Sequence, residues 1–477
     1  MTGLIHNGST TAASAPSRAD TVASAGPSCK TLPAATDQAF PANGAAAPVP
    51  PAAGQSSDIG AGLPPVAYVL LWFPLSSETF IFREVVQLRK LGLPVHAYTL
   101  YGAKLRGCSE EMRRYDGPVR RLGAKAAGAI LAAFVTALWK EPRQVWRLLR
   151  QGFFHRMRNL ESLGENLWCF MAGFLLARYC REDGVRLIHA AWANGPATAA
   201  WVASRLTGIP FAFTGRAGDI YPEDGLLREK SADALFIRTN NHTNVRWLRQ
   251  FCPQEQQDKV HAIYNSLTFT PRGQCAIAMR PPYRLLAVGR FARTKGFPYL
   301  LTAMARLRRE NVPVTLTLVG DGRWRRKLTA MCERLRLQDV VNMPGFIPHD
   351  QICGYMLDHD ILIMPSVVHT NGDRDGIPNV IMEALSHRMP VIATDVCGIA
   401  EVVEDGVTGL LVPQRDARAL ADAVRRMVED RDRAQSMAEA GRERVTRMFD
   451  RERNIATLLD LYVSEGRRYW QAPSSQA

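Results

Sequence analysis

The chain has 477 residues, of which 47% are hydrophobic and 22% charged, and a formal net charge of +14. This length favours two domains, and the composition is typical of a globular protein. No segment reaches the roughly 18 apolar residues of a membrane-spanning helix, so we expect no part of this sequence to cross a bilayer. The nine cysteines form no C-x-x-C pair and have no His at metal-ligand spacing, so we expect reduced thiols in a cytoplasmic protein.

Residues 1–65 are rich in Ala, Pro, Ser and Gly and contain few large apolar side chains. Such a segment cannot bury enough surface to offset the entropy of ordering it, so we expect a disordered tail. It lacks the basic start and continuous apolar core of a secretion signal.

The fold is predicted to begin at residues 66–73, a continuous apolar run typical of a strand buried on both faces. A polar turn and a helical pattern over 80–88 follow, which together make half of a Rossmann-like unit. The same alternation continues to about residue 278. The further strands expected in this first domain cover residues 95–100, 187–192, 211–214, 234–237 and 260–265.

A basic helical segment covers residues 104–160. From Lys104 to Arg158 it contains 13 Lys and Arg against 4 Asp and Glu, with Trp139 and Trp146 among the arginines. Basic helices with interleaved aromatics are typical of contact with an anionic membrane surface. Two alternatives stay open: the arginines are merely solvated, or they bind nucleic acid, although no nucleic-acid-binding motif accompanies them.

Residues 279–448 restart the alternation, which predicts a second Rossmann-like domain. A strand over 283–290 is followed by a helix over 299–308. Arg290 ends the strand and Lys295 precedes the helix, which puts both at the ligand edge of a doubly wound sheet. An Arg fork with a Lys point charge suits a diphosphate. The further strands expected here cover residues 314–319, 340–343, 361–365 and 405–412.

The stretch 364–394 carries the most chemical information. Asp375 and Gly376 form a turn that leads through Pro378 into an apolar helical run. The free amides of Asn379 and Val380, at the positive end of that helix, would form an anion site. Glu383, one turn further in, can accept two hydrogen bonds from a ribose diol, and Asp375 can do the same for a second polyol. The alternative is an ordinary Asp-Gly turn before a solvated helix.

This stretch resembles the signature of family-four retaining glycosyltransferases, in particular the bacterial exopolysaccharide (colanic-acid-type) subgroup, with its Gly-Asp-x-acid-Gly-Ile-Pro. The residues at 74–81 and 289–296 are similar to the subgroup's Pro-x-x-Ser-Glu-Thr-Phe-Ile and Gly-Arg-x-x-x-x-Lys-Gly. The resemblance implies the GT-B fold, an α/β arrangement of two Rossmann-like domains facing a cleft. A terminal helix within 449–477 would then cross back to the first domain.

The resemblance also implies roles for individual residues. Ser77 and Glu78 would lie in a loop facing the cleft. Arg216 stands where the family has a His beside the transferred sugar, and Asp219 would orient Arg216 or cap the next turn. Asp375 stands where the family usually has Glu. Phe346 and Ile347 would flank the nucleotide base, unless Phe346 belongs to the core.

The reaction implied is transfer of a sugar from a UDP- or GDP-sugar to an acceptor hydroxyl, with retention at the anomeric carbon, in surface glycan assembly. Arg216, Asp375 and Glu383 would be its catalytic residues, and neither a metal nor a cofactor would be needed. The acceptor would be a glycan or a lipid-linked sugar, reached from the cytoplasm or the inner face of the membrane. Two alternatives are a degenerate protein that binds a sugar nucleotide or glycan without transfer, and another reaction such as hydrolysis or epimerisation.

Overall fold

A computed structural model describes residues 63–76, 78–153, 160–222, 225–266 and 279–470. The tail expected over 1–65 therefore lies outside the described residues up to residue 62, as do Ser77 and the last part of the basic segment, 154–159. The boundary expected near residue 278 also follows a stretch, 267–278, that the structure does not describe.

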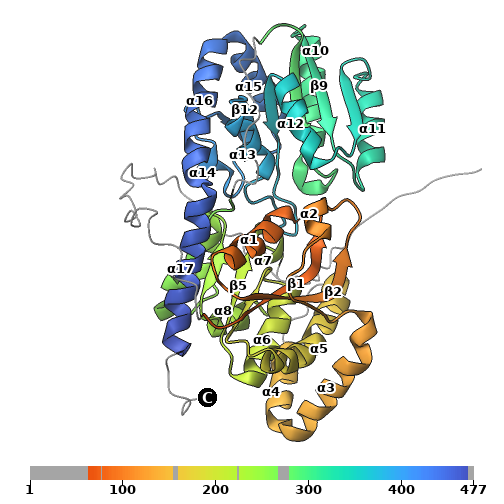
Figure 1. The fold of residues 1–477 in the computed structure, drawn as a ribbon. Coiled ribbons are helices and arrows are strands. Elements are labelled where there is room, and N and C mark those ends of the chain that lie inside the picture. Colours follow the sequence, from red (N-terminus) through yellow and green to blue (C-terminus); the bar gives the residue numbers. More distant parts are fainter. Residues whose placement is uncertain (1–62, 77, 154–159, 223–224, 267–278, 471–477) are drawn as a thin grey trace, which may run out of the picture. The chain divides into compact units, whose positions relative to one another are not determined.

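The first sheet has seven parallel strands in the order β3-β2-β1-β4-β5-β6-β7 (Figure 1). β1 is an interior strand between β2 and β4, and its first five residues are all buried because helices cover both faces. The strands are β1 (Val66–Leu75), β2 (Val95–Lys104), β3 (Val119–Arg121), β4 (Leu187–Ala190), β5 (Phe211–Gly215), β6 (Ile237–Thr239) and β7 (Val260–Ala262).

Nine α-helices and two short 3-10 helices are described between these strands. The helices are α1 (Thr79–Lys90), α2 (Glu110–Arg113), η1 (Ala124–Ala126), α3 (Ala127–Lys140), α4 (Pro142–Phe153), α5 (Leu160–Glu182), α6 (Gly195–Thr207), α7 (Ala217–Ile220), α8 (Leu227–Asp233), α9 (His242–Arg249) and η2 (Gln254–Lys259). The small residues of α6 allow it to pack closely on β1 and β4, where it buries Trp201 completely.

The second sheet has six parallel strands in the order β10-β9-β8-β11-β12-β13. These strands are β8 (Tyr283–Val288), β9 (Val314–Val319), β10 (Val341–Gly345), β11 (Ile361–Met364), β12 (Val391–Thr394) and β13 (Leu410–Val412). The helices are η3 (Arg293–Lys295), α10 (Phe297–Arg309), α11 (Arg325–Arg334), α12 (His349–Asp358), α13 (Asn379–Ser386), α14 (Ile399–Val402), α15 (Ala417–Glu429), α16 (Arg431–Met448) and α17 (Arg451–Trp470). Two Rossmann-like domains are therefore present, as the sequence predicts.

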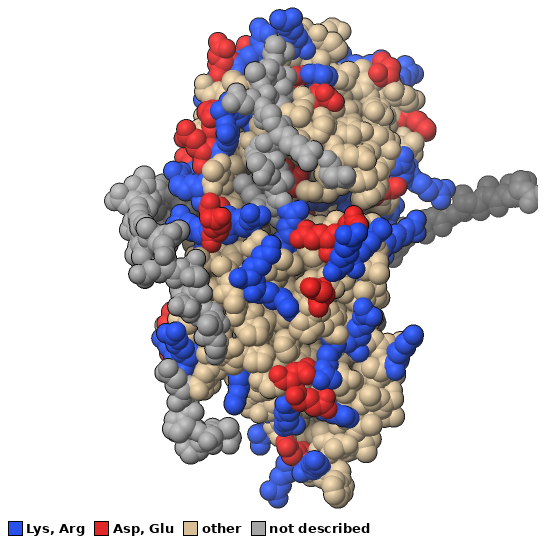
Figure 2. Space-filling view, in the orientation of Figure 1, with Lys and Arg blue, Asp and Glu red and all other residues tan. Residues whose placement is uncertain are grey.

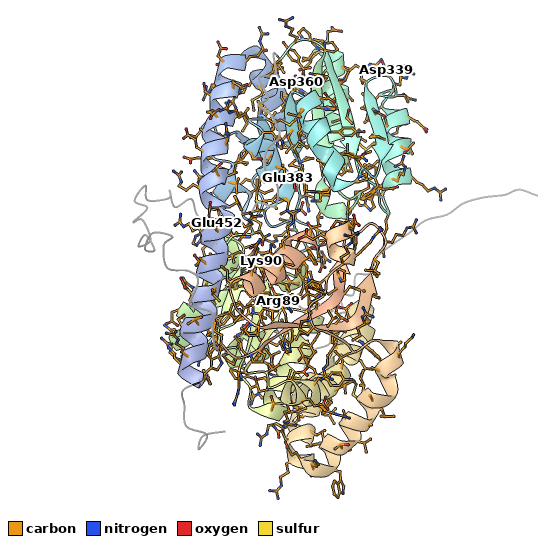
Figure 3. The ribbon with its side chains drawn as sticks, viewed as in Figure 1. Arg89, Lys90, Asp339, Asp360, Glu383 and Glu452 are labelled. Atoms are coloured by element: carbon orange, nitrogen blue, oxygen red, sulfur yellow. The ribbon has the colours of Figure 1, made fainter. Side chains whose placement is uncertain are left out.

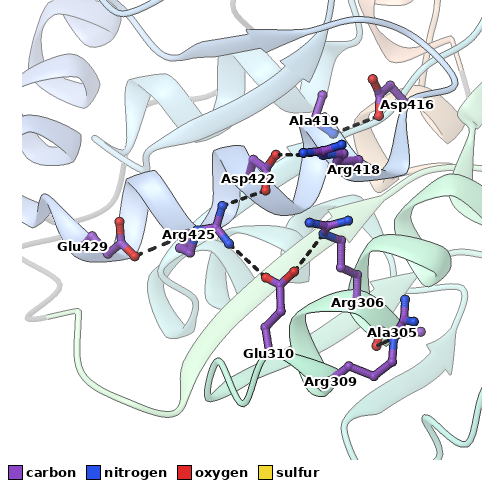
Figure 4. Close-up of polar contacts among 10 residues, drawn as sticks. All are labelled: Ala305, Arg306, Arg309, Glu310, Asp416, Arg418, Ala419, Asp422, Arg425 and Glu429. Carbon is purple, nitrogen blue, oxygen red and sulfur yellow. Dashed lines mark hydrogen bonds and ion pairs between the residues drawn. The ribbon is translucent and has the colours of Figure 1, made fainter.

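Ion pairs join α10 and α15 on the outside of the second domain. Glu310, the C-cap residue of α10, lies 2.9 Å from Arg306 of that helix and 3.0 Å from Arg425 on α15 (Figure 4). Arg425 also pairs with Asp422 at 2.7 Å. Exposed pairs of this kind each contribute at most about 1 kcal/mol, so the buried apolar residues beneath them supply most of the attachment.

The last helix, α17, completes the core of the first domain. Its Leu458 and Tyr462 are buried in the same cluster as Tyr68 of β1. The Tyr462 ring lies 5.4 Å from the His189 ring and 5.7 Å from the Phe236 ring. α17, within the segment 449–477, thus packs against residues of the first domain.

The structure departs from the predicted elements in several places. β13 covers only Leu410–Val412 of the strand predicted over 405–412. β6 covers Ile237–Thr239 rather than 234–237, because pairing with β5 begins only at Phe213 and Ile237. β3 was not predicted; it is a three-residue edge strand, and two of its residues are arginines. Within the described ranges, no helix combines the length and apolar character needed to cross a membrane.

Candidate active site

The candidate site lies at the carboxyl edge of the second sheet. β8 is flanked by β9 on one side and β11 on the other, so the chain leaves these strands in opposite directions. In open α/β sheets, ligands bind in the crevice formed at such a point. Arg290 and Lys295 follow β8, while Ser366 and Asp375 follow β11. The topology therefore brings the predicted diphosphate and sugar residues to the same edge.

An ion pair joins the two loops. Lys295 Nζ lies 3.1 Å from Asp375 Oδ1, and the side chains are only 14% and 17% exposed. Ser366 Oγ donates a hydrogen bond of 2.6 Å to the other oxygen, Asp375 Oδ2. Gly296, directly after Lys295, has a φ of +62°, and a Cβ there would lie 1.7 Å from the carbonyl oxygen of Pro365. Glycine is required at 296 for the two loops to approach this closely.

A second carboxylate lies beside this pair. The pKa of Asp373 is raised by burial and by the neighbouring charge of Asp375, while the Arg290 guanidinium opposes the shift. Arg290 itself is exposed. No acidic residue in the described part of the chain forms an ion pair with it, so its guanidinium is accessible to an anion.

Helix α13 starts at this edge. Pro378 is its N-cap residue, with φ −63° and ψ 126°, one position before the first helical turn. No acceptor among the described residues takes a hydrogen bond from the backbone amides of Asn379 and Val380. With Lys295 in the adjoining loop, these amides at the positive end of the helix dipole favour an anion.

Glu383 lies on the buried side of α13 (Figure 3). Its side chain is 10% exposed, and Oε1 lies 2.9 Å from Nε2 of His349, whose side chain is 51% exposed. The sequence analysis did not select His349. A single His at the start of a helix gives no signal in the sequence, and only the pairing of the strands brings it next to Glu383.

Phe346 and Ile347 follow β10 at the same edge. The side chain of Phe346 is 75% exposed, so the alternative that places it in the core is wrong. Ile347 is half-buried and packs against the cluster that includes Ile352 and Ile381. An exposed ring beside a fixed aliphatic side chain is a surface on which a planar base can stack.

Arg216 lies after β5, at the carboxyl edge of the first sheet, and is buried. One guanidinium nitrogen, Nη1, donates a hydrogen bond to the Ala191 carbonyl oxygen. The guanidinium carbon lies 4.7 Å from the centre of the Trp192 ring and 5.0 Å from that of Phe80. Its Nε and Nη2 atoms have no hydrogen-bond partner among the described residues. Burial, and next the charge of Arg238, lower the pKa of Arg216.

Asp219 holds the backbone around Arg216. Its two carboxylate oxygens accept hydrogen bonds from the backbone amides of Arg216 and Ala193, each at 2.6 Å. The capping alternative is therefore the one observed, since Asp219 bonds the start of the short helix α7 and not the guanidinium. The structure does not bring Arg216 and Asp375 together. Glu78, in the neighbouring loop, has a pKa raised by burial and partly restored by Arg216.

Direct contacts link the Asp375 loop to the first domain. The Arg374 guanidinium lies 3.9 Å from the centre of the Tyr221 ring. Glu401, on α14, also contacts the first domain, because its carboxylate accepts hydrogen bonds from the backbone amides of His242, at 3.0 Å, and Thr243, at 2.9 Å. None of these contacts is visible in the sequence, because each joins residues more than 150 positions apart. In the part of the chain that is described, no three His, Cys, Asp or Glu side chains gather as a metal site.

Comparison with known proteins connects this arrangement to sugar transfer. Residues 279–444 match the family described as Glycosyl transferases group 1. The chain is 27% identical over 414 residues to the putative colanic acid biosynthesis glycosyltransferase WcaL of Escherichia coli, covering 83% of this chain and 99% of that protein. It is 31% identical over 186 residues to the amylovoran biosynthesis glycosyltransferase AmsK of Erwinia amylovora, covering 38% of this chain and 46% of that protein.

Solved structures share the fold. Sucrose-phosphate synthase from Thermosynechococcus elongatus matches with a TM-score of 0.65 at 21% identity, covering 86% of this chain and 100% of that one. Anabaena HepE, in complex with UDP and glucose, matches with a TM-score of 0.63 at 17% identity, covering 84% of this chain and 100% of that one. The GT-B fold and the resemblance to exopolysaccharide glycosyltransferases, both predicted from the sequence, are confirmed.

Proposed function

We propose that this chain, whose residues 279–444 are a glycosyl transferase group 1 domain, is a retaining glycosyltransferase. It would move a hexose from a UDP- or GDP-sugar to a hydroxyl of a glycan or lipid-linked acceptor on the cytoplasmic side, in exopolysaccharide or other surface glycan assembly. The observation that carries this proposal is the meeting of Lys295, Asp375 and the start of α13 at one sheet edge, with Glu383 one turn further along the helix.

The donor would bind to cationic side chains, backbone amides and carboxylates at that edge of the second sheet. Lys295, Arg290 and the amides of Asn379 and Val380 would hold the diphosphate. Glu383 would accept the ribose hydroxyls, its position fixed by His349 at 2.9 Å. The base would stack beside Phe346 and Ile347, and the transferred sugar would bind at Asp375 and Gly376.

In the reaction, the bond from the anomeric carbon to the diphosphate oxygen breaks and a bond to the acceptor oxygen forms on the same face of the ring. The acceptor proton is lost to the departing diphosphate or to water. Negative charge grows on the leaving group, where Lys295, Arg290 and the dipole of α13 would stabilise it. These groups supply the charge stabilisation that a metal ion supplies in other transferases, so we propose a metal-independent reaction.

Arg216 would act from the opposite domain. Asp219 fixes its backbone, and one guanidinium nitrogen is held by Ala191, which leaves Nε and Nη2 as buried donors without a protein partner. Buried donors usually have a partner, so we infer that a hydroxyl of the sugar or acceptor completes the site. Glu78 lies in the adjoining cleft loop. We do not place Ser77, which lies outside the described residues.

A binder without transfer is the competing proposal, and one observation favours it: Asp375 is already paired with Lys295 and Ser366. A panel of UDP- and GDP-sugars separates the alternatives if binding, nucleotide release and sugar transfer are scored separately. Retaining transfer requires that the nucleotide is released only when an acceptor is present. The anomeric configuration of the product must also match that of the donor. Nucleotide release without an acceptor would indicate hydrolysis. A chemically altered sugar would indicate epimerisation. Binding with neither nucleotide release nor a change in the sugar would indicate a degenerate protein.

A further inference from the structure

Helix α3 is apolar on the face that it exposes as well as on the face that it buries. Toward the core, Ile130 is buried, and the Phe134 ring lies 5.0 Å from that of Phe174 on α5. On the outer face, Leu131 is 58%, Val135 54% and Trp139 82% exposed. No charged residue occurs from 126 to 139. A helix that is hydrophobic all round normally lies inside a protein or against lipid.

The one hydroxyl on this outer face is bonded within the helix. Thr136 Oγ1 donates a hydrogen bond of 2.7 Å to the carbonyl oxygen of Ala132, one turn earlier. A hydroxyl satisfied in this way can leave water without losing a hydrogen bond. From Ala127 to Trp139, the exposed face of α3 therefore has no polar side chain whose transfer from water would carry a large penalty. The exposed Lys140 ends the helix.

Helix α4, which packs beside α3, is amphipathic and basic. It buries Val145 and Leu148 in the first domain. Its outer face presents Arg143, Arg147 and Arg150, with Trp146 between them at 62% exposure. None of these three arginines forms an ion pair with any described residue. Their charge is available to an external partner.

Exposed apolar side chains are concentrated here. Of the ten large hydrophobic residues with exposed side chains in the described ranges, five lie between Leu131 and Trp146. Figure 2 shows a tan area over α3, with Lys and Arg side chains next to it. A contiguous apolar surface bordered by unpaired cations marks an interaction site, and not a solvated face.

We propose that α3 and α4 dock on the surface of an anionic lipid bilayer. Leu131, Val135 and Trp139 would enter the boundary between headgroups and acyl chains, and Trp146 would lie at headgroup level. Arg143, Arg147 and Arg150 would contact lipid phosphates. Within the basic segment predicted from the sequence, α3 would therefore supply the apolar contacts with the bilayer and α4 the cationic contacts.

Charge argues against a second copy of this chain as the occupant. A two-fold dimer brings the same patch of both subunits together, so the α4 arginines of one copy would approach those of the other. Like charges at such an interface oppose association, whereas an anionic bilayer complements them. A bilayer also accepts the apolar face of α3 without requiring shape complementarity.

The test uses the full chain and co-sedimentation with vesicles of phosphatidylcholine, with and without phosphatidylglycerol. We expect binding only to the anionic vesicles at low salt. Leu131→Ser with Trp139→Ser should weaken binding at least tenfold. The matched control changes two exposed apolar side chains elsewhere, Val407→Ser with Tyr469→Ser, and should bind like the unaltered protein.

A second set of variants tests the cationic half. Changing Arg143, Arg147 and Arg150 to Gln should weaken binding at low salt by roughly a hundredfold, since each charge near such a surface contributes about fivefold. The loss should shrink at high salt, because screening removes the same contribution. The control carries the same charge change on exposed arginines of the second domain, Arg309, Arg326 and Arg334.

Circular dichroism and melting temperature establish that each variant is folded, and the altered residues are exposed, so we expect no loss of stability. The proposal is overturned if the unaltered chain ignores anionic vesicles, or if both α3 and α4 variants bind as well as their controls. It is also overturned if the α3 variant changes a dimer into a monomer while vesicle binding stays the same. Vesicle binding needs no sugar donor, so this proposal and the proposed transfer reaction can fail independently.

Discussion

Lys295 and Asp375 form an ion pair across the loops that follow β8 and β11, with Nζ 3.1 Å from Oδ1. In the proposed reaction the two residues bind different parts of the donor, Lys295 the diphosphate and Asp375 the sugar. The Asp375 carboxylate therefore positions the Lys295 ammonium before the donor binds. The same carboxylate also competes with the donor diphosphate for the Lys295 ammonium.

This competition predicts opposite effects on binding and turnover for Asp375→Asn. Removing the charge of Asp375 frees Lys295, so the affinity for the nucleoside diphosphate should rise about threefold to tenfold. Sugar transfer should fall roughly a hundredfold, since a contact to the reacting sugar is lost. Calorimetry with UDP and GDP and an acceptor assay measure the two quantities. Lys295→Met is the comparison, and the prediction fails if both variants weaken nucleotide binding equally.

Glu383→Gln should weaken donor binding about tenfold to a hundredfold and nearly abolish transfer. The amide cannot accept both ribose hydroxyls, and losing a charged acceptor from a buried hydrogen bond costs roughly 1.5 to 3 kcal/mol. Calorimetric titration with the accepted donor measures the change. The exposed Glu443 on α16 provides a control as Glu443→Gln. Unchanged donor affinity in Glu383→Gln would remove this residue from the site.

Arg216→Ala should lower turnover more than donor affinity. Arg216 lies in the first domain and contacts Ala191, Phe80 and Trp192 rather than the diphosphate residues. Because the side chain is buried, steady-state kinetics must be measured below the melting temperature of the variant. The double change Arg216→His with Asp375→Glu gives the decisive outcome. If it creates transfer that the unaltered chain lacks with every donor, the chain is a degenerate binder.

The buried pair of Glu84 and Arg238 should contribute strongly to folding. Glu84 accepts hydrogen bonds from Arg238 and from the Tyr68 hydroxyl, and all three side chains are buried. Glu84→Gln would leave the arginine charge uncompensated, which costs about 3 to 5 kcal/mol of unfolding free energy. Glu310→Gln, in the exposed pairs of Figure 4, should cost at most about 1 kcal/mol. Urea denaturation of both variants at neutral pH compares them directly.

His189 should make the protein less stable in acid. Burial lowers the pKa of His189 to about 3. In the unfolded chain the pKa is about 6.5, so as the pH falls from about 6.5 toward 3 the unfolded state takes up a proton that the folded state does not. The unfolding free energy then drops by about 1.4 kcal/mol per pH unit.

This contribution is measured as a difference, because Asp219 acts in the opposite direction. Burial raises the pKa of Asp219 to about 7, so the folded state binds the extra proton between about pH 4 and 7 and is stabilised as the pH falls. Denaturation of the unaltered chain and of His189→Gln at pH 7.5, 6 and 5 separates the two effects. Equal pH dependence in both proteins would show that His189 does not titrate as expected.

The strands and helices were predictable where their pattern is local. The apolar runs before Pro74 and before Gly289 predict buried strands, and β1 and β8 are observed there. β3 was not predictable, because Val119, Arg120 and Arg121 form a strand only through their pairing with β2 at the edge of the sheet.

For the candidate site, the types of residue were predictable and their partners were not. Arg290, Lys295 and Asp375 follow strands, so the parallel sheet brings them to one edge. The direction of Arg216 depends on the Ala191 carbonyl and two aromatic rings, and the position of Glu383 depends on His349. Such contacts join distant parts of the chain and leave no local pattern.

The return of α17 to the first domain has a consequence for synthesis of the chain. Ribosomes would complete β1 to β7 long before Leu458 and Tyr462 emerge, yet both side chains belong to the same buried cluster as Tyr68. Until the last residues are made, the newly made first domain exposes the apolar surface that α17 will cover. Its final folding step must then wait for release of the chain, so a premature stop codon near residue 450 would produce an aggregation-prone fragment even though every strand has been translated.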